Sequence, residues 1–304
     1  MTWSEDSIHR WLFALPVRKG RLGVEGHDAA VLAGFSGRPV WCVDQTIEGV
    51  HFDPGAPPRR VGAKAAARAL SDLAATAAEP RAILVALSAP KARTEKWIRA
   101  VLAGARAMAH ENGADLVGGD LACAPGPAHV TVAALGETSG EASPPRRDRV
   151  RAGQAIVLTG PVGGSLLGRH LRIRPRVRAA RTLADLGATG MMDTSDGLAW
   201  DLFRLARTSQ VAIEIDLESV PVHRDARKLA RRDGREALFH ALHDGEDHEI
   251  LASLPPRAAA RAARRIPGLA ILGRARRGSG LWLVDGSGRA RRWRRSEGGF
   301  EHGR

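Results

Sequence analysis

Short acidic segments recur along this chain of 304 residues, and each is set in apolar or small residues. Asp44 follows Val-Trp-Cys-Val, Asp120 follows Leu-Val-Gly-Gly, and Asp193 follows Gly-Met-Met. Apolar stretches of this kind are typical of β-strands, and α/β proteins place ligand-binding groups on the loops that follow strand ends. The pattern therefore predicts an α/β fold with several carboxylates at strand ends.

Six such segments together indicate a metal site. Their sequences are GHDAAV, CVDQTIEGVHF, ALSDLAA, LVGGDLA, MMDTSDGLAWDL and HDGEDHEIL. Carboxylates gathered from several loops repel one another unless a cation lies between them, and hard oxygen ligands suit Mg²⁺, which also binds substrate phosphates. Small neighbours such as Gly119 and Gly197 let the backbone approach a phosphate closely. The residues alone predict magnesium-assisted nucleotide chemistry.

The expected elements follow a similar order in the two halves of the chain. In the first half, strands are expected at DAAVLAGF, PVWCVDQTI, RAILVALSAP, ADLVGGD and HVTVAALGET, and helices at 59–78 and 94–112. In the second half, AIVLTGPVGGSLLGRHL predicts a strand, a glycine turn and a helix, and a further helix is expected over 224–241. Residues 139–154 combine Pro, Ser, Gly and charge, as linkers do. We expect an α/β (α+β) chain of two domains, residues 1–140 and 150–304.

The net charge of +13 comes almost entirely from arginine. Such a charge is compatible with nucleic-acid binding, but no zinc finger, helix-turn-helix or RNP-type aromatic motif accompanies it. A GC-rich genome that encodes basic surface positions as arginine is the simpler explanation of the charge and the one we favour. The densest run, residues 289–299, is expected to be a solvated edge, and nucleic acid is an unlikely partner.

The location of the protein is constrained by features that the sequence lacks. No uninterrupted apolar run of about 18 residues occurs, so no membrane span is expected. The N-terminal segment carries acidic residues early and has no basic region followed by an apolar one, unlike a signal peptide. Cys42 and Cys123 are too few for a disulfide framework or a cysteine-based zinc site. We expect a cytoplasmic protein.

Several motifs also have a structural interpretation. Ser195 or Asp196 lies where a helix begins and is suited to the N-cap position. Asp72 lies four residues after Arg68, which lies four after Lys64, so the three fit a surface salt-bridge ladder. The glycines of TGPVGG suit either a phosphate cradle or a plain turn, and His51 suits either a ligand site or the core.

Taken in order, these motifs resemble those of the thiamine-monophosphate kinases, a family of the aminoimidazole ribonucleotide synthetase-like superfamily. GHDAAV is similar to the family's Gly-Asp-Asp-Ala-Ala-Val, DQTIEGVHF to Asp-Thr-Leu-Val-Glu-Gly-Val-His-Phe, and DTSDGL to Asp-Ile-Ser-Asp-Gly-Leu. GEDHEI resembles Gly-Glu-Asp-Tyr-Glu-Leu, and GGFEH resembles the closing Gly-Tyr/Phe-Asp-His. The resemblance covers nearly the whole chain, from about residue 20 to residue 302.

The resemblance implies roles for the matching positions. The implied magnesium ligands are Asp28, Asp44, Asp72, Asp120, Asp193 and Asp196, of which Asp44, Asp72, Asp120 and Asp196 would be catalytic. The implied contacts with ATP and its phosphates are Gly119, Asp120, Arg147 and Ser195. The residues that would face thiamine monophosphate are His51, Glu246 and Phe300.

The resemblance also implies a reaction and an assembly. The γ-phosphoryl group of ATP would pass directly to thiamine monophosphate, giving thiamine diphosphate, with metal ions and arginine supplying most of the catalysis. No protein nucleophile would be needed. The family fold is two α/β domains, with the sheets of the N-terminal domains pairing into a homodimer.

Six positions depart from the family motifs, namely His27, Gln45, Ala69, Leu121, Asp244 and His248. Because the aspartates themselves are retained, binding of magnesium and ATP is expected. The sequence leaves open whether the six substitutions preserve turnover. The alternative is a divergent member of the superfamily that binds Mg-ATP and either acts on another substrate or is not catalytic.

Overall fold

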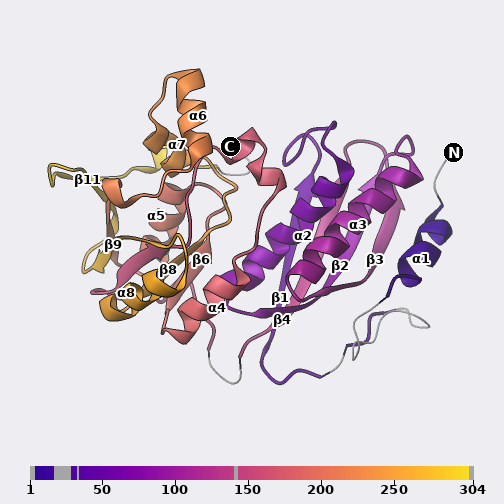
Figure 1. Ribbon diagram of the computed structural model, residues 1–304, viewed down its shortest axis with the longest axis horizontal. Coiled ribbons are helices and arrows are strands. Elements are labelled where there is room, and N and C mark those ends of the chain that lie inside the picture. Colours follow the sequence, from indigo (N-terminus) through magenta and orange to yellow (C-terminus); the bar gives the residue numbers. More distant parts are fainter. Residues whose placement is uncertain (1–3, 17–28, 33, 140–142, 301–304) are drawn as a thin grey trace. The chain divides into compact units, whose positions relative to one another are not determined.

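The computed structural model describes residues 4–16, 29–32, 34–139 and 143–300. The chain divides into two compact units, and each is described by itself (Figure 1). The first unit contains residues 1–73, 78–142 and 171–173, and the second contains residues 74–77, 143–170 and 174–304. In the described part of the chain, no helix has both the length and the apolar character needed to cross a membrane.

The first unit is built on a four-stranded sheet. Its strands are β1 (Pro39–Ile47), β2 (Glu79–Ala89), β3 (Asp115–Cys123) and β4 (His129–Glu137), and its helices are α1 (Glu5–Phe13), α2 (Pro58–Ala75) and α3 (Glu95–Glu111). The strand order is β1-β4-β2-β3, with β2 parallel to β3 and the other neighbours antiparallel. The strand expected at DAAVLAGF is not formed at 29–32 or 34–35, the part of it that is described.

Helices α2 and α3 pack together against one face of this sheet (Figure 1). Two glycines allow their backbones to touch, because a Cβ atom on Gly62 would lie 1.8 Å from the carbonyl oxygen of Val101 and one on Gly104 would lie 2.0 Å from that of Arg59. Alternate β2 residues enter the core below the helices: Ile83, Val85, Leu87 and Ala89. This alternation follows from the pleat of the strand, which sends successive side chains to opposite faces.

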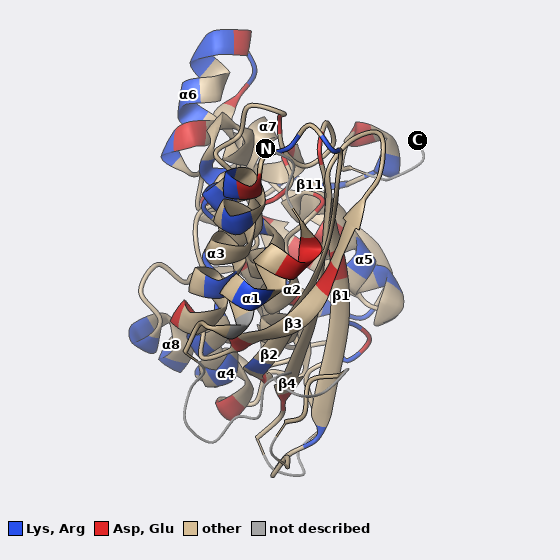
Figure 2. Ribbon diagram, turned by 90° about the vertical axis from the view of Figure 1, so that its right-hand side faces the viewer, with Lys and Arg blue, Asp and Glu red and all other residues tan. Residues whose placement is uncertain are grey.

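The other face of the same sheet is apolar. Ala30 and Leu32 pack over Ala82, Val117 and Leu135, while the part around Trp41 and Val43 is exposed. Trp41 of β1 lies opposite Leu135 of β4, and Val43 lies opposite Ala133, which in turn lies opposite Leu84 of β2. Trp41 is 72% exposed and Val43 is 66% exposed. Figure 2 shows these strands mostly in tan, the colour of uncharged residues. We call the surface formed by Trp41, Val43, Leu84 and Ala133 the open face.

The second unit is built on a seven-stranded mixed sheet in the order β11-β10-β7-β9-β5-β8-β6. Its strands are β5 (Ala155–Leu158), β6 (Gly190–Asp193), β7 (Ala212–Asp216), β8 (Ile250–Leu254), β9 (Ala270–Arg276), β10 (Gly280–Val284) and β11 (Ala290–Arg292). Its α-helices are α4 (Val177–Asp185), α5 (Leu198–Thr208), α6 (Arg224–Asp233), α7 (Ala237–His243) and α8 (Pro256–Arg265).

The central strands β5 and β8 of this second sheet are buried on both faces. Residues of α5 and α7 share one hydrophobic cluster with Ile156 and Leu158 of β5, while residues of α4 and α8 share another with Ala155 and Val157. A strand covered on both faces needs apolar side chains on both, which explains the unbroken Ala-Ile-Val-Leu sequence of β5. The same holds for β8, whose five residues are all buried.

Two helix predictions for this unit need correction. Residues 224–241 form two helices instead of one, because α6 ends at Gly234, whose φ of 76° is left-handed. The helix expected after TGPVGG is replaced by two short 3₁₀ turns, Ser165–Leu167 and Arg169–Leu171, separated by Gly168 with φ of 110°. Glycine adopts this conformation without steric cost, so in both places it ends the helical run.

Candidate functional site

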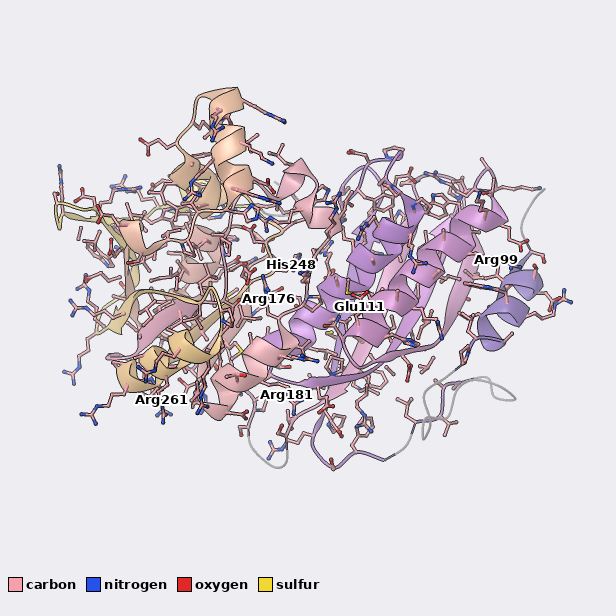
Figure 3. The ribbon with its side chains drawn as sticks, viewed as in Figure 1. Arg99, Glu111, Arg176, Arg181, His248 and Arg261 are labelled. Carbon is pink, nitrogen blue, oxygen red and sulfur yellow. The ribbon has the colours of Figure 1, made fainter. Side chains whose placement is uncertain are left out.

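The chain leaves β6 at Asp193 and enters α5 at Leu198 through residues 194–197, which we call the 194–197 turn. Asp193 is 3% exposed, and its Oδ2 atom lies 3.1 Å from Nδ1 of His248. Arg176, drawn near His248 in Figure 3, pairs with the adjacent residue Glu249. The turn therefore begins from a buried carboxylate that the end of β6 and a histidine hold in place.

The 194–197 turn is held by Asp201, a fully buried residue in the first turn of α5. The backbone N–H groups of Ser195 and Asp196 donate to its Oδ2 atom at 3.1 and 3.2 Å. The N-cap of α5 is Gly197, and no side chain caps the helix there. The interpretation of Ser195 or Asp196 as an N-cap is therefore wrong. The backbone N–H groups of these two residues bind the side chain of Asp201, which lies within α5.

Negative charge is concentrated at this turn. Burial raises the pKa of Asp201 well above its usual range, and the carboxylates of Asp196 and Asp193 raise it further. Arg204, one helical turn along α5, opposes this effect, because its guanidinium pairs with Asp196 and lies 3.4 Å from Oδ1 of Asp201. The same guanidinium lies 5.1 Å from the ring centre of Trp200.

A second segment, residues 243–249, lies against the turn. The N–H of Glu246 donates to the carbonyl oxygen of Ser195, and the N–H of His248 donates to that of Thr194, both at 2.7 Å. The approach is close enough that a Cβ atom on Gly245 would lie 2.6 Å from the Ser195 oxygen. Glycine is therefore required at position 245.

A third segment comes from the C-terminal part of the chain, where the N–H of Phe300 donates to the carbonyl oxygen of Asp196 at 3.0 Å. The Phe300 side chain is 51% exposed. Four residues predicted from three separate motifs thus meet in one hydrogen-bonded cluster: Ser195, Asp196, Glu246 and Phe300. Asp201 and Arg204 belong to the same cluster but were missed, although both follow the DTSDGL motif directly and their spacing places them on one helix face.

The glycine loop TGPVGG is a turn that binds carboxylates of its own chain. The N–H of Gly163 donates to both carboxylate oxygens of Asp247, and the N–H of Gly164 donates to Asp244. Arg169 donates to Asp247 at 2.7 Å, yet burial raises the pKa of Asp247 to about 6. Because protein carboxylates take these two N–H groups, the phosphate-cradle interpretation is not supported and the plain turn is.

In the first unit, Asp44 lies on the helix side of the sheet. Its carboxylate pairs with Arg68 of α2 at 3.0 Å and accepts the N–H of Gln45 at 2.8 Å. Lys64 is fully buried and donates to the carbonyl oxygen of His51 at 2.5 Å, so Lys64, Arg68 and Asp72 do not form the surface ladder considered above. Asp72, one turn beyond Arg68 on α2, is partly buried.

His51 is buried at 9% exposure, and its Nδ1 atom accepts the N–H of Ile47 at 3.0 Å. Nδ1 therefore carries no proton, and a neutral ring carries it on Nε2. Together with the bond from Lys64 to its carbonyl oxygen, this contact ties His51 into the loop after β1. The surroundings favour the structural interpretation of this histidine.

The side chains of Asp120 and Asp44 project from opposite faces of the sheet. Asp120 lies in the middle of β3, in register with Ala86 of β2, whereas Gly119 is in register with the core residue Val85. The neighbour Leu121 is 8% exposed and packs in the core, so Asp120 projects to the open side, where it is exposed. Neither Asp44 nor Asp120 ends its strand, so for these two residues the expected position at a strand end is wrong.

Gly119 has a steric reason to be glycine. A Cβ atom there would lie 1.9 Å from the carbonyl oxygen of Val85, inside the sheet. Arg147 is exposed, and its carbonyl oxygen accepts hydrogen bonds from Thr208 and Ser209 at the C-terminal end of α5. This is the opposite end of α5 from the 194–197 turn, about 15 Å away along the helix, so Arg147 does not join the cluster.

The structure describes only some of the predicted metal ligands. Asp28 and His27 lie outside the described residues. Within the described ranges, no group of three or more His, Cys, Asp or Glu side chains is placed to hold a metal ion. The predicted ligands Asp44, Asp72 and Asp120 belong to the first unit, and Asp193 and Asp196 belong to the second.

Both the N-terminal and the C-terminal part of the chain match known protein families. Residues 26–138 match the model of the AIR synthase related protein N-terminal domain, and residues 150–274 match that of the C-terminal domain. The thiamine-monophosphate kinase of Rhodopirellula baltica is 37% identical over 225 residues, covering 73% of this chain and 70% of the relative.

Solved structures agree with this assignment. The thiamine-monophosphate kinase of Stenotrophomonas maltophilia aligns with a TM-score of 0.78 at 30% identity, covering 93% of this chain and 97% of that chain. The structure of AaThiL complexed with AMPPCP and TMP aligns with a TM-score of 0.79 at 25% identity, covering 98% of this chain and 95% of that one. The chain belongs to the thiamine-monophosphate kinase family of AIR synthase related proteins.

Proposed function

We propose that this protein transfers the γ-phosphoryl group of ATP to thiamine monophosphate. The observation that carries the proposal is the convergence of Ser195, Asp196, Glu246 and Phe300, which come from three distant segments and are joined by backbone hydrogen bonds. In the proposed roles, Ser195 and Asp196 meet the nucleotide, and Glu246 and Phe300 meet the second substrate. Relatives that are thiamine-monophosphate kinases, one of them with AMPPCP and TMP bound, support the activity, and the division of these residues between the two substrates is part of the proposal.

The chemistry needs charge neutralisation more than proton transfer. The acceptor is itself a phosphate, so two anionic groups must approach each other and no hydroxyl proton has to be removed. No histidine or cysteine is therefore required as a base or nucleophile. Arginine and magnesium would supply the positive charge that holds the phosphates together.

Magnesium is part of this proposal. Carboxylate oxygens are its preferred protein ligands, and Asp193 and Asp196 lie at the end of β6 and in the 194–197 turn, so the type of donor fits the ion. The proposed ligands are Asp28, Asp44, Asp72, Asp120, Asp193 and Asp196, and because Asp44 and Asp120 project from opposite faces of one sheet, these two would not share one ion. When bound, Mg²⁺ would neutralise phosphate charge and orient the transferred group.

Local contacts account for several departures from the family motifs. Leu121 and Ala69 pack in the core of the first unit. Asp244 accepts the N–H of Gly164, and His248 contacts Asp193. The fold accommodates these four substitutions.

One observation favours the competing function, binding of Mg-ATP without transfer. Asp44 and Asp196 are each paired with an arginine, Arg68 and Arg204. If these pairs persisted with nucleotide bound, they would occupy carboxylates that the transfer needs. Measured product formation separates the two functions.

We further propose a homodimer formed through the open face. Trp41 and Val43 present large apolar side chains there, and burying them against a second copy removes apolar area from water at about 25 cal/mol per Å². An isologous contact of this kind buries the same patch on both subunits. The family resemblance implies the same sheet pairing.

The function is tested by incubating the purified protein with ATP, Mg²⁺ and thiamine monophosphate and separating the products by chromatography. Thiamine diphosphate above a no-enzyme control, absent with Asp72→Asn and retained with Asp285→Asn, supports the proposal. Asp285 lies in the exposed turn between β10 and β11 and serves as the matched carboxylate. No product despite Mg-ATP binding would favour the competing function.

A further inference from the structure

We infer that Asp201 and Arg204 are positioning residues of the phosphoryl-transfer site: Asp201 fixes the backbone of the 194–197 turn, and Arg204 fixes the carboxylate of Asp196. The inference rests on the proposed function and deepens it. It concerns two residues of α5 for which the sequence predicted no role.

The first step is the arrangement of hydrogen bonds on two consecutive residues. The N–H groups of Ser195 and Asp196 donate to Oδ2 of Asp201, at 3.1 and 3.2 Å. Their carbonyl oxygens accept from Glu246 and Phe300, at 2.7 and 3.0 Å. With both peptide groups held on both sides, the direction of the two side chains is set by Asp201 as much as by the neighbouring segments.

The second step is the burial of Asp201 beside Arg204. Asp201 is fully buried, and the oxygens of a buried acidic side chain need hydrogen bonds or a cation as partners. Its Oδ2 atom accepts the two N–H groups of the turn, and its Oδ1 atom lies 3.4 Å from the guanidinium of Arg204. The two oxygens of one side chain thus join the turn to Arg204.

The third step is the placement of Arg204. Its guanidinium is held by Asp201, by the ring of Trp200 and by Asp196. Arg204 lies three residues after Asp201 on α5, so the two share one face of the helix. Because Asp201 and Trp200 restrict the guanidinium, its contact with Oδ2 of Asp196 restrains that carboxylate as well.

The experiment measures binding and turnover on the full chain at a temperature well below the melting temperature of every variant. Titration calorimetry with Mg-AMPPCP gives the nucleotide Kd, and an Mg²⁺ titration at saturating ATP gives the half-saturating metal concentration. The variants are Asp201→Asn, Arg204→Gln and Arg204→Lys. Asp285→Asn is the matched control, because Asp285 also accepts two backbone N–H groups, from Ser287 and Arg289.

We expect Asp201→Asn and Arg204→Gln to raise the Kd for Mg-AMPPCP and the half-saturating Mg²⁺ concentration by about 10- to 100-fold, as loss of residues that orient metal ligands typically does. Arg204→Lys should recover part of this loss, since it restores the charge. Asp285→Asn should leave both values within about 2-fold of wild type, well below that range.

Melting temperatures separate positioning from folding. A merely structural role lowers the melting temperature of Asp201→Asn and leaves its metal dependence unchanged, and that result overturns the inference. If Asp201→Asn does not fold, Arg204→Gln decides, because Arg204 is partly exposed and its unchanged Kd and metal dependence would overturn the inference equally. A wild-type protein that fails to bind Mg-AMPPCP overturns the proposed function, whereas wild-type binding retained by both variants overturns only this inference.

Discussion

In the second unit, the 194–197 turn accepts hydrogen bonds from two other segments and donates to Asp201 of α5. In the first unit, Asp44 and Asp120 lie within strands, and their side chains project from opposite faces of one sheet. A turn directs several groups toward one point because its backbone is free to curve. A strand alternates its side chains, so neighbouring rows point to opposite sides. The same local pattern, an apolar stretch followed by aspartate, therefore has two structural outcomes.

The aspartates of the first unit and those of the 194–197 turn also differ in the residues that they contact. Asp44 faces the helices and pairs with Arg68, while Asp120 is exposed on the side of the open face. Asp196 is paired with an arginine that is itself fixed by a buried aspartate. We expect loss of a carboxylate in the first unit to affect chemistry with little effect on folding, and changes around the 194–197 turn to affect both.

The largest expected effect is on turnover after Asp44→Asn. The change removes a negative charge proposed to hold Mg²⁺, and we expect the rate to fall by about 10³-fold, the upper range for loss of one electrostatic group in an active site. The melting temperature should change little, because Asp44 is not part of the hydrophobic core. Steady-state rates and thermal melts measure the two quantities, and a near-native rate would contradict the assignment of Asp44.

The next effect is on assembly. Trp41→Glu places a charge in the proposed dimer interface, where an unpaired buried charge costs several kcal/mol, so the variant should sediment as a monomer while the wild type sediments as a dimer. Leu166→Glu is the control, since Leu166 is 65% exposed in the second unit. A monomeric wild type, or a dimeric Trp41→Glu variant, would show that the open face does not pair.

A smaller effect is expected when the segments around the turn are forced apart. Gly245→Ala puts a Cβ atom against the Ser195 carbonyl oxygen, and such overpacking costs about 1–3 kcal/mol. Both the free energy of unfolding and the affinity for Mg-AMPPCP should fall. Gly55→Ala, which meets nothing within 4 Å, is the control. Equal behaviour of the two variants would mean that the contact at Ser195 is unimportant.

The smallest effect concerns pH. The pKa of Asp247 is raised to about 6 in the folded protein, so between pH 4 and 6 the folded state holds a proton that the unfolded chain has released. The contribution of Asp247 to stability is therefore present below the unfolded pKa and is lost as pH rises toward 6. It amounts to at most about 3 kcal/mol.

Asp247→Asn should abolish this part of the pH dependence. Urea unfolding at a series of pH values between 4 and 7 measures it as a change in slope relative to wild type. The control is Asp285→Asn, because hydrogen bonds lower the pKa of Asp285 and its contribution has the opposite sign. Identical slopes for wild type and Asp247→Asn would contradict the raised pKa.

Parts of the site were predictable because local sequence determines them. The DTSDGL and GEDHEI motifs each give a turn with glycine where another segment comes close, and the family resemblance links the two turns to one site. The alternation of β5 between two cores also follows from its unbroken apolar sequence.

Other parts depend on contacts that no local pattern encodes. The burial of Lys64 depends on the position of the loop after β1. The spacing of Arg68 and Asp72 suits an ion pair along one helix. In the structure, however, Arg68 pairs with Asp44 of β1, which lies 24 residues earlier in the chain. The role of Asp201 depends on the chain folding back over the start of α5, and the face of Asp120 depends on strand register.

The central claim is direct phosphoryl transfer to thiamine monophosphate. The most direct test uses ATP labelled in its γ-phosphate, with Mg²⁺ and thiamine monophosphate, and follows the label into products for wild type and Asp196→Asn. The account predicts label in the terminal phosphate of thiamine diphosphate, one for each ADP formed, and none with Asp196→Asn. Label released only as free phosphate, or no ADP at all, would contradict it.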